Sequence, residues 1–183
     1  RAEYLETVIR ILDKWEVMTE KMQEIRQVLR SQNETWDRTE SNALIEDAVA
    51  TVRENSPDAT IVTELADGGE IRLPATLSIA VQELIENAIE VKKDATVEVG
   101  LSRPEDGWVE ITVKDDGPGL PAMEADVLET GEETPLNHGQ GLGLWMVRVI
   151  VTQIGGDVSV DSTADGATVR LRLPTEWMVE PRR

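Results

Sequence analysis

The stretch of sequence that decides the fold begins with Asp115-Asp116-Gly117-Pro118-Gly119 and closes with Gly139-Gln140-Gly141-Leu142-Gly143-Leu144. The residues between these two glycine clusters are mostly polar and acidic, and the second cluster opens an apolar helix. Glycines at this density let backbone N–H groups come close to a ligand, and a helix N-terminus presents unpaired N–H donors and a positive dipole end to phosphate. The spacing therefore predicts an anion-binding loop, although either cluster alone is also typical of a simple turn.

The composition is that of a globular chain. With 183 residues and 40% hydrophobic content, it can bury one domain and carry an appended element. No apolar run reaches bilayer length, and there is no N-terminal signal pattern. Because the sequence starts on Arg1 in what reads as the middle of a helix, we expect a cytoplasmic fragment that meets a membrane only through segments upstream. Cysteine is absent, which excludes disulfides and leaves Asp, Glu, Asn or His as metal ligands.

The charge balance is strongly acidic. There are 36 acidic and 18 basic residues, a net charge of −18, and the acidic excess is spread over every segment. Such a chain is a poor partner for nucleic acid. It also repels itself, and salt at about 1 M would shorten the screening length to about 3 Å and relieve that repulsion. We therefore hypothesise a halophilic protein, adapted to a salty cytoplasm.

Residues 1–30 are expected to form one long amphipathic helix. Apolar residues recur in alternating four- and three-residue steps, at Tyr4, Val8, Ile11, Trp15, Met18, Met22, Ile25 and Leu29. Residues 3–30 would extend for about 40 Å, which is longer than one small domain can cover. Further apolar residues widen the stripe beyond a two-stranded seam, so a four-helix bundle made by two chains is favoured over an ordinary core helix.

A second domain is expected over residues 41–175, after a polar linker at residues 31–40 in which a short strand can form, and before a tail at residues 176–183. Helices are predicted at residues 43–55, with Ser41 as the cap, at 74–91 and at 142–154. Hairpins are predicted to join 59–65 with 70–73, 96–102 with 108–114, and 157–161 with 167–173. The expected fold is an α/β two-layer sandwich, with a mixed, mostly antiparallel sheet of about five strands and three helices on one face.

The predicted helix at residues 74–91 carries a polar pair with possible chemistry. Glu83 and Asn87 are four residues apart and therefore lie one above the other on a shared face. A carboxylate and an amide oxygen placed in this way can hold Mg²⁺, which usually keeps waters and bridges to phosphate oxygens. A solvated helix face would look the same, so the pair gains meaning only from its surroundings.

Three segments in order resemble the motifs of one known family. Gln82-Glu83-Leu84-Ile85-Glu86-Asn87-Ala88 resembles the N box of sensor histidine kinases, and the two glycine clusters resemble their two glycine boxes. These kinases share the Bergerat ATP-binding fold with gyrase, heat-shock chaperone ATPases and mismatch-repair ATPases. Gly166-Ala167-Thr168, leading to Leu173-Pro174, is similar to the last strand of the family, and residues 3–30 are similar to the second helix of its dimerisation hairpin.

The resemblance implies a role for each matched residue. Asn87 would ligate Mg²⁺, Glu83 would orient or deprotonate the phosphoryl acceptor, and Asp115 would hydrogen-bond the adenine amino group with Thr168 assisting through water. The other implied ATP contacts are backbone contacts, at Gly117 and Gly119 beside the base, and at Gly139, Gly141, Leu142 and Gly143 around the phosphates. The residues between the glycine boxes would form a lid over ATP.

The sequence departs from the family pattern in three places. The phosphoacceptor histidine is missing, because the one histidine, His138, falls inside the lid. Glu90 stands where the family often has a basic residue, so Lys92, Lys93 or the lid would have to meet the phosphates. The lid has no phenylalanine, which leaves Leu128 or Leu136 to replace its packing.

The resemblance implies the ATP-binding catalytic portion of a sensor histidine kinase. It would move the ATP γ-phosphoryl group to a histidine upstream of Arg1, and from there to an aspartate in the receiver domain of a response regulator. Two alternatives stay open. One is a serine kinase of the anti-sigma type on the same fold, and the other is a non-catalytic nucleotide-binding module that works through dimerisation.

The salt hypothesis predicts a large effect on stability. Thermal unfolding of the protein should move to a higher midpoint between low and molar potassium chloride, because screening weakens the repulsion within a chain of net charge −18. Equal midpoints in the two salts would refute the hypothesis.

Overall fold

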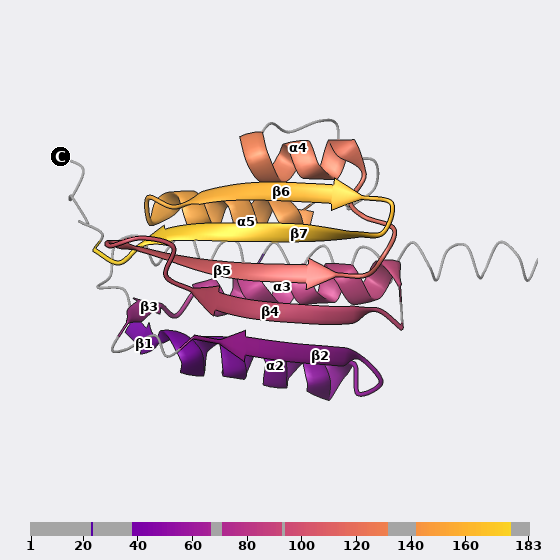
Figure 1. The fold of residues 1–183 in the computed structure, drawn as a ribbon, viewed down its shortest axis with the longest axis horizontal. Coiled ribbons are helices and arrows are strands. Elements are labelled where there is room, and N and C mark those ends of the chain that lie inside the picture. The colour runs from indigo at the N-terminus through magenta and orange to yellow at the C-terminus, as the bar shows by residue number, and fades with distance from the viewer. Residues whose placement is uncertain (1–22, 24–37, 67–70, 93, 132–141, 177–183) are drawn as a thin grey trace, which may run out of the picture.

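The computed structural model describes residue 23 and residues 38–66, 71–92, 94–131 and 142–176. In these residues, a five-stranded mixed sheet carries helices on one face, beside a separate two-stranded ribbon (Figure 1). The large sheet has the order β2-β4-β5-β7-β6, formed by β2 (Thr60–Leu65), β4 (Thr96–Ser102), β5 (Trp108–Asp115), β7 (Gly166–Pro174) and β6 (Asp157–Thr163). The helices are α2 (Ser41–Asn55), α3 (Leu77–Val91), α4 (Ala122–Thr130) and α5 (Leu142–Gln153). The predicted two-layer α/β sandwich is confirmed.

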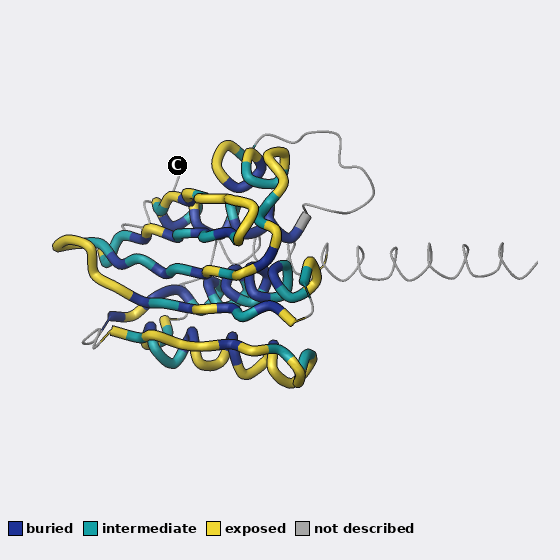
Figure 2. The backbone as a smooth tube through the Cα atoms, turned by 45° about the vertical axis from the view of Figure 1, so that its right-hand side comes forward, coloured by how far each residue is buried: buried dark blue, intermediate teal, exposed yellow. Residues whose placement is uncertain are grey.

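The core lies between the sheet and helices α2, α3 and α5 (Figures 1 and 2). The apolar residues on one face of α3 are buried, namely Leu77, Ala80, Val81, Leu84, Ile85 and Ala88. They meet the inward-facing side chains of the strands, of which Val109, Ile111 and Val113 on β5 are examples. Since burying one such large apolar side chain contributes about 1.5–3 kcal/mol, this packing fixes α3 against β5.

The hairpin predicted between residues 59–65 and 70–73 is wrong. Strand β2 pairs with β4 in parallel, with Ile61 opposite Val97, and the short strand β3 (Arg72–Pro74) pairs instead with β1 (Arg38–Glu40). A turn signal leads to a hairpin only if the strand after the turn is long enough to pair with the strand before it. Strand β3 has only three residues and ends on a proline. Strand β4 offers seven residues and reaches β2 through the α3 crossover.

The predicted cap at Ser41 is also wrong. Helix α2 begins at Ser41 itself, and the preceding residue, Glu40, makes no side-chain cap hydrogen bond. The Ser41 backbone N–H donates to the Ile71 carbonyl at 2.9 Å, which extends the β1–β3 pairing into the helix start. That pairing places Ser41 in a buried position, where its hydroxyl has no partner among the described residues.

Helix α4 was not predicted. It lies beyond the β6 edge of the sheet, with Val127 and Leu128 buried (Figure 1). Its Glu129 carboxylate accepts a hydrogen bond from the Val160 backbone N–H at 3.0 Å, so the helix covers a strand edge that would otherwise be open. Pro121 before α4 and Gly131 after it, the latter at φ 71°, are the sequence signals that mark its ends.

Several predictions fall outside the described residues. The heptad helix predicted at residues 3–30 lies outside the described residues, with the exception of Gln23. The tail after residue 176 also lies outside them. No helix among the described residues is long and apolar enough to cross a bilayer.

Candidate functional site

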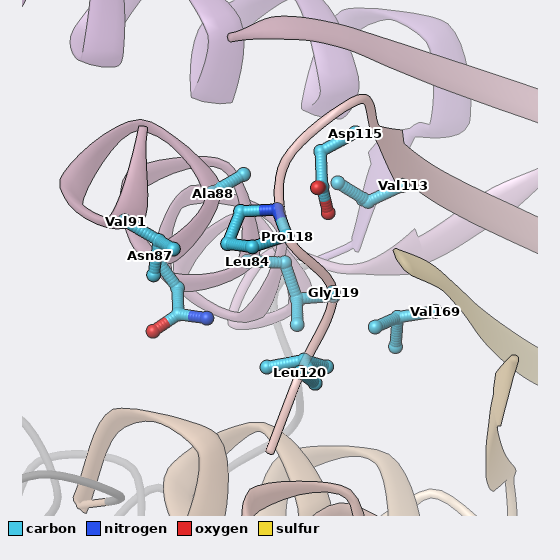
Figure 3. Close-up of a pocket in the computed structure, with 10 residues that line it drawn as sticks. All are labelled: Leu84, Asn87, Ala88, Val91, Val113, Asp115, Pro118, Gly119, Leu120 and Val169. Atoms are coloured by element: carbon cyan, nitrogen blue, oxygen red, sulfur yellow. The ribbon is translucent and has the colours of Figure 1, made fainter. Parts of the chain in front are cut away.

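A cavity opens between α3, the end of β5 and the loop that follows β5 (Figure 3). It encloses about 380 Å³ of space, a figure that includes open solvent. Its walls are formed by Leu84, Asn87, Ala88, Val91, Val113, Asp115, Pro118, Gly119, Leu120 and Val169. Three of the residues predicted for the site, Asn87, Asp115 and Gly119, thus lie on the walls of one cavity. Their roles in ligand binding stay predictions.

Helix α3 supplies the wall that carries Asn87. The Asn87 side chain is half-buried and lines the cavity, and Glu83 lies one turn earlier on the same helix. Glu83 is 7% exposed and is the one buried charged side chain among the described residues. A buried carboxylate is costly unless it has polar or charged partners, and Glu83 has such an interaction. Its catalytic role stays a prediction.

Strand β5 supplies Asp115. Opposite it in the antiparallel register is the buried Val97, which places Asp115 on the side of the sheet that faces the helices. The carboxylate oxygen Oδ1 of Asp115 accepts a hydrogen bond from the Gly117 backbone N–H at 2.8 Å. A Cβ atom at Gly117 would lie 2.8 Å from the same oxygen, so a larger residue there would displace the carboxylate.

Two further glycines permit close backbone contacts around this loop. Gly119 has φ 79°, and a side chain on it would overlap the Thr163 carbonyl oxygen. Gly166 has φ 141°, and a side chain there would overlap the carbonyl oxygen of Asp115. The turn between β6 and β7 therefore packs directly on the backbone of the Asp115 loop. Gly119 is required by this contact with the protein's own backbone, because any side chain there would collide with it.

Thr168 does not line this cavity. It lies opposite the exposed Lys114 in the β5–β7 register, whereas its neighbours Ala167 and Val169 are buried on the helix side. Because side chains alternate across a strand, Val169 is the β7 residue that reaches the cavity. The water-mediated adenine contact of Thr168 stays a prediction.

The structure describes part of the segment that is predicted to hold the phosphates. Gly143 is buried in the first turn of α5, and Leu142 begins that helix. Gly139, Gly141 and His138 lie outside the described residues, as does Leu136. Leu128 is fully buried in α4. Its replacement of the missing phenylalanine stays a prediction.

The charges around the cavity differ from the expected pattern. Lys92, one candidate for a phosphate contact, donates from Nζ to Asp116 Oδ1 at 3.1 Å and to the Asp116 carbonyl at 3.2 Å. Burial raises the pKa of Glu124 on α4, and the nearby negative charge of Glu90 on α3 raises it further. The carboxylates of Glu90 on α3 and Glu124 on α4 are therefore close enough to repel each other.

The donor set suits a cation carried by a ligand. No group of three or more His, Cys, Asp or Glu side chains that could hold a metal occurs among the described residues. The Asn87 amide oxygen is nevertheless a hard ligand on the cavity wall, and Mg²⁺ commonly takes one or two protein oxygens and completes its shell with waters and phosphate oxygens. The residues present therefore fit Mg²⁺ bound together with a nucleotide.

A second hollow lies at the opposite end of the sheet, by the turn between β4 and β5. It holds about 960 Å³ of space that includes open solvent, and it is lined in part by Arg38, Arg72, Arg103 and Trp108. None of the residues predicted for the site lies there.

Known proteins resemble this chain along the same residues. The family described as histidine kinase-, DNA gyrase B-, and HSP90-like ATPase matches residues 72–176, which is more than half of the chain. Sensor histidine kinase GlnK of Bacillus subtilis is 28% identical over 106 residues, which are 55% of this chain and 26% of GlnK. The C4-dicarboxylate transport sensor protein DctB of Rhizobium meliloti is 34% identical over 106 residues, which are 58% of this chain and 17% of DctB. The chain thus matches about a quarter or less of the length of these relatives.

Solved structures share the fold. The mycobacterial sensor histidine kinase MprB has a TM-score of 0.65 at 23% identity, with 79% of this chain and 100% of that chain covered. Full-length ShkA, solved in complex with AMPPNP, has a TM-score of 0.74 at 17% identity, with 98% of this chain and 40% of that chain covered.

The chain belongs to the family of histidine kinase-, DNA gyrase B-, and HSP90-like ATPases. Within that family, its relatives are sensor histidine kinases, as the N box and the two glycine boxes predicted.

Two substitutions test the site directly. Asp115→Asn should weaken ATP binding about 10- to 100-fold with or without Mg²⁺, because hydrogen bonds to a charged group contribute about 1.5–3 kcal/mol. Asn87→Ala should instead remove most of the gain in affinity that Mg²⁺ gives. Isothermal calorimetry with and without the metal separates the two effects. Glu98→Gln, on the outer face of the sheet, is the matched control, and unchanged affinity in both site variants would refute the assignment.

Proposed function

We propose that this chain is the ATP-binding catalytic portion of a two-component sensor histidine kinase and that it binds Mg²⁺-ATP in the cavity between α3 and β5. The observation that carries the proposal is the meeting of Asn87 and Asp115 on the walls of one cavity, inside the residues that the family matches. In Figure 3, the Asp115 carboxylate and the Asn87 amide lie on either side of the loop with Pro118 and Gly119. One end of the cavity would hold the base and the other the phosphates.

Each residue of the site would contact a different part of ATP. The Asp115 carboxylate would accept a hydrogen bond from the exocyclic amino group of adenine, while the apolar walls at Leu84, Val113 and Val169 would enclose the ring. The Asn87 amide oxygen would ligate Mg²⁺, which would neutralise charge on the phosphates. Backbone amides at the start of α5, from Gly139 to Gly143, would hold the phosphate oxygens. ShkA, a structural neighbour, was solved with the ATP analogue AMPPNP, which supports this ligand class.

Phosphoryl transfer needs positioning and one proton acceptor. An imidazole nitrogen of the acceptor histidine attacks the γ-phosphorus, the bond from that phosphorus to the β–γ bridging oxygen breaks, and ADP leaves. Glu83 would orient the imidazole and take the proton from its other nitrogen. The acceptor would be a histidine upstream of Arg1, since His138 is the one histidine of the sequence.

The whole protein would act as a dimer in a signalling relay. Residues 3–30 would pair with those of a second chain in the dimerisation bundle, and the phosphoryl group would pass on to the receiver aspartate of a response regulator. Residues 31–40 would link this helix to the catalytic domain at 41–175. The named relatives GlnK and DctB, both sensor proteins, support this placement. A membrane anchor, if the parent protein has one, would lie upstream, and the acidic surface would suit a salt-rich cytoplasm.

Phosphoryl transfer can be tested separately from binding. In the parent protein with its dimerisation hairpin, Glu83→Gln should slow autophosphorylation from radiolabelled ATP at least about 100-fold, because a positioned acid–base group contributes roughly 10²–10⁴-fold. ATP affinity should stay within about threefold.

The chemistry of the label distinguishes the rival functions. A phosphohistidine loses its label in acid and keeps it in alkali. Label that survives acid would favour a serine kinase. Tight ATP binding by wild type without any incorporated label would favour a non-catalytic nucleotide-binding module.

A further inference from the structure

Asp116 makes three polar contacts directly beside the predicted adenine acceptor. Its Oδ1 accepts hydrogen bonds from the Thr96 backbone N–H at 2.9 Å and from Lys92 Nζ at 3.1 Å, and its own carbonyl accepts a second bond from Lys92 Nζ at 3.2 Å. No role in nucleotide binding was predicted for Asp116. The sequence gives no reason to select Asp116, because it is one of 36 acidic residues in the chain.

The three contacts join the ends of three elements. Lys92 follows the last residue of α3, the helix that carries Asn87, and Thr96 is the first residue of β4. Asp116 follows the last residue of β5, which is Asp115. One carboxylate therefore links the C-terminal end of α3 and the start of β4 to the backbone that carries Asp115.

The direction of the chain at Asp116 sets the position of the Asp115 side chain. Immediately after Asp116, the Gly117 backbone N–H donates to Asp115 Oδ1 at 2.8 Å. If the chain turned differently at Asp116, this donor would move and the carboxylate would turn with it. On the other side, the β6–β7 turn at Gly166 packs against the Asp115 carbonyl, so the loop is held from both sides.

The contact is suited to positioning and contributes little to global stability. The hydrogen bond from Thr96 lowers the pKa of Asp116, and Lys92 lowers it further, so the carboxylate stays ionised at neutral pH. The side chains of Lys92 and Asp116 are 36% and 51% exposed, and exposed ion pairs add little to the free energy of unfolding. What the three hydrogen bonds fix is geometry.

We propose that Asp116 is a positioning residue which, together with Lys92, holds the Asp115 carboxylate in the orientation that selects adenine over hypoxanthine. The proposal rests on the proposed function, in which Asp115 accepts a hydrogen bond from the adenine amino group. ITP has a carbonyl oxygen where ATP has that amino group, so the ratio of the two affinities measures the orientation of Asp115. Substitution of a residue that merely stabilised the fold would weaken the binding of ATP and ITP alike and leave the ratio of the two affinities unchanged.

The experiment compares ATP and ITP binding by calorimetry in Asp116→Asn, Lys92→Met and the double variant. Asparagine keeps an oxygen that can accept from Thr96, and methionine at the half-exposed Lys92 keeps the aliphatic packing, so both variants are expected to fold. Each should lower the ATP-to-ITP affinity ratio about fivefold or more, with ITP affinity changed less than about twofold. The double variant should lose no more than Lys92→Met alone, because Asp116→Asn removes only the charge that strengthens the hydrogen bond from Lys92, and Lys92→Met removes that bond itself.

The control is a second exposed lysine–carboxylate pair, which lies on strands β4 and β5. Lys114 Nζ and Glu98 Oε2 are 2.9 Å apart on the outer face of the sheet, away from the cavity. Lys114→Met and Glu98→Gln should leave the ratio unchanged. If they lower it as much as Lys92→Met does, general loss of surface charge is the cause and the proposal is overturned.

Asp115→Asn separates failure of this proposal from failure of the proposed function. If Asp115→Asn removes the ATP preference and the Lys92 and Asp116 variants keep it, the adenine site stands and the positioning role is wrong. If wild type binds ATP and ITP equally, or Asp115→Asn leaves the preference intact, the adenine assignment itself fails and the positioning proposal falls with it.

Discussion

The structure depends on one steric constraint, the close approach of backbone to backbone around Asp115. The β6–β7 turn can touch the Asp115 carbonyl because position 166 has no side chain, and the loop can touch the end of β6 because position 119 has none. These contacts hold the loop against β6 and β7, while Asp116 ties it to α3 and β4. The cavity wall is thus positioned by strands that are distant in the sequence.

Much of this arrangement was predictable from local patterns. The apolar repeat of α3, the alternation of β4 and β5, and the order of the three motifs predicted the layers and placed Asn87 beside Asp115. What local patterns missed came from competition between distant segments. Strand β2 pairs with β4 and not with the nearer β3, because β3 is short and ends in Pro74. Ser41 does not cap α2, because its backbone N–H extends the β1–β3 pairing.

The site was less predictable than the fold for the same reason. Gly119 was expected to make room for the base, yet the structure gives it a protein neighbour, the Thr163 carbonyl. Lys92 was one of three alternatives for meeting phosphate, beside Lys93 and the lid, and in the structure it donates a hydrogen bond to Asp116. The face of β7 on which Thr168 lies follows from its register with Lys114, which the motif alone does not specify. The motifs identified segments that line the cavity, and strand register decided which of their side chains reach it.

The central claim is that one cavity, between α3 and the Asp115 loop, holds Mg²⁺-ATP. The most direct measurement is a crystal structure with Mg²⁺ and a non-hydrolysable ATP analogue. The account predicts the adenine amino group within hydrogen-bond distance of the Asp115 carboxylate and Mg²⁺ ligated by the Asn87 amide oxygen. A nucleotide found elsewhere, for example in the hollow lined by Arg38, Arg72 and Arg103 at the other end of the sheet, would contradict it.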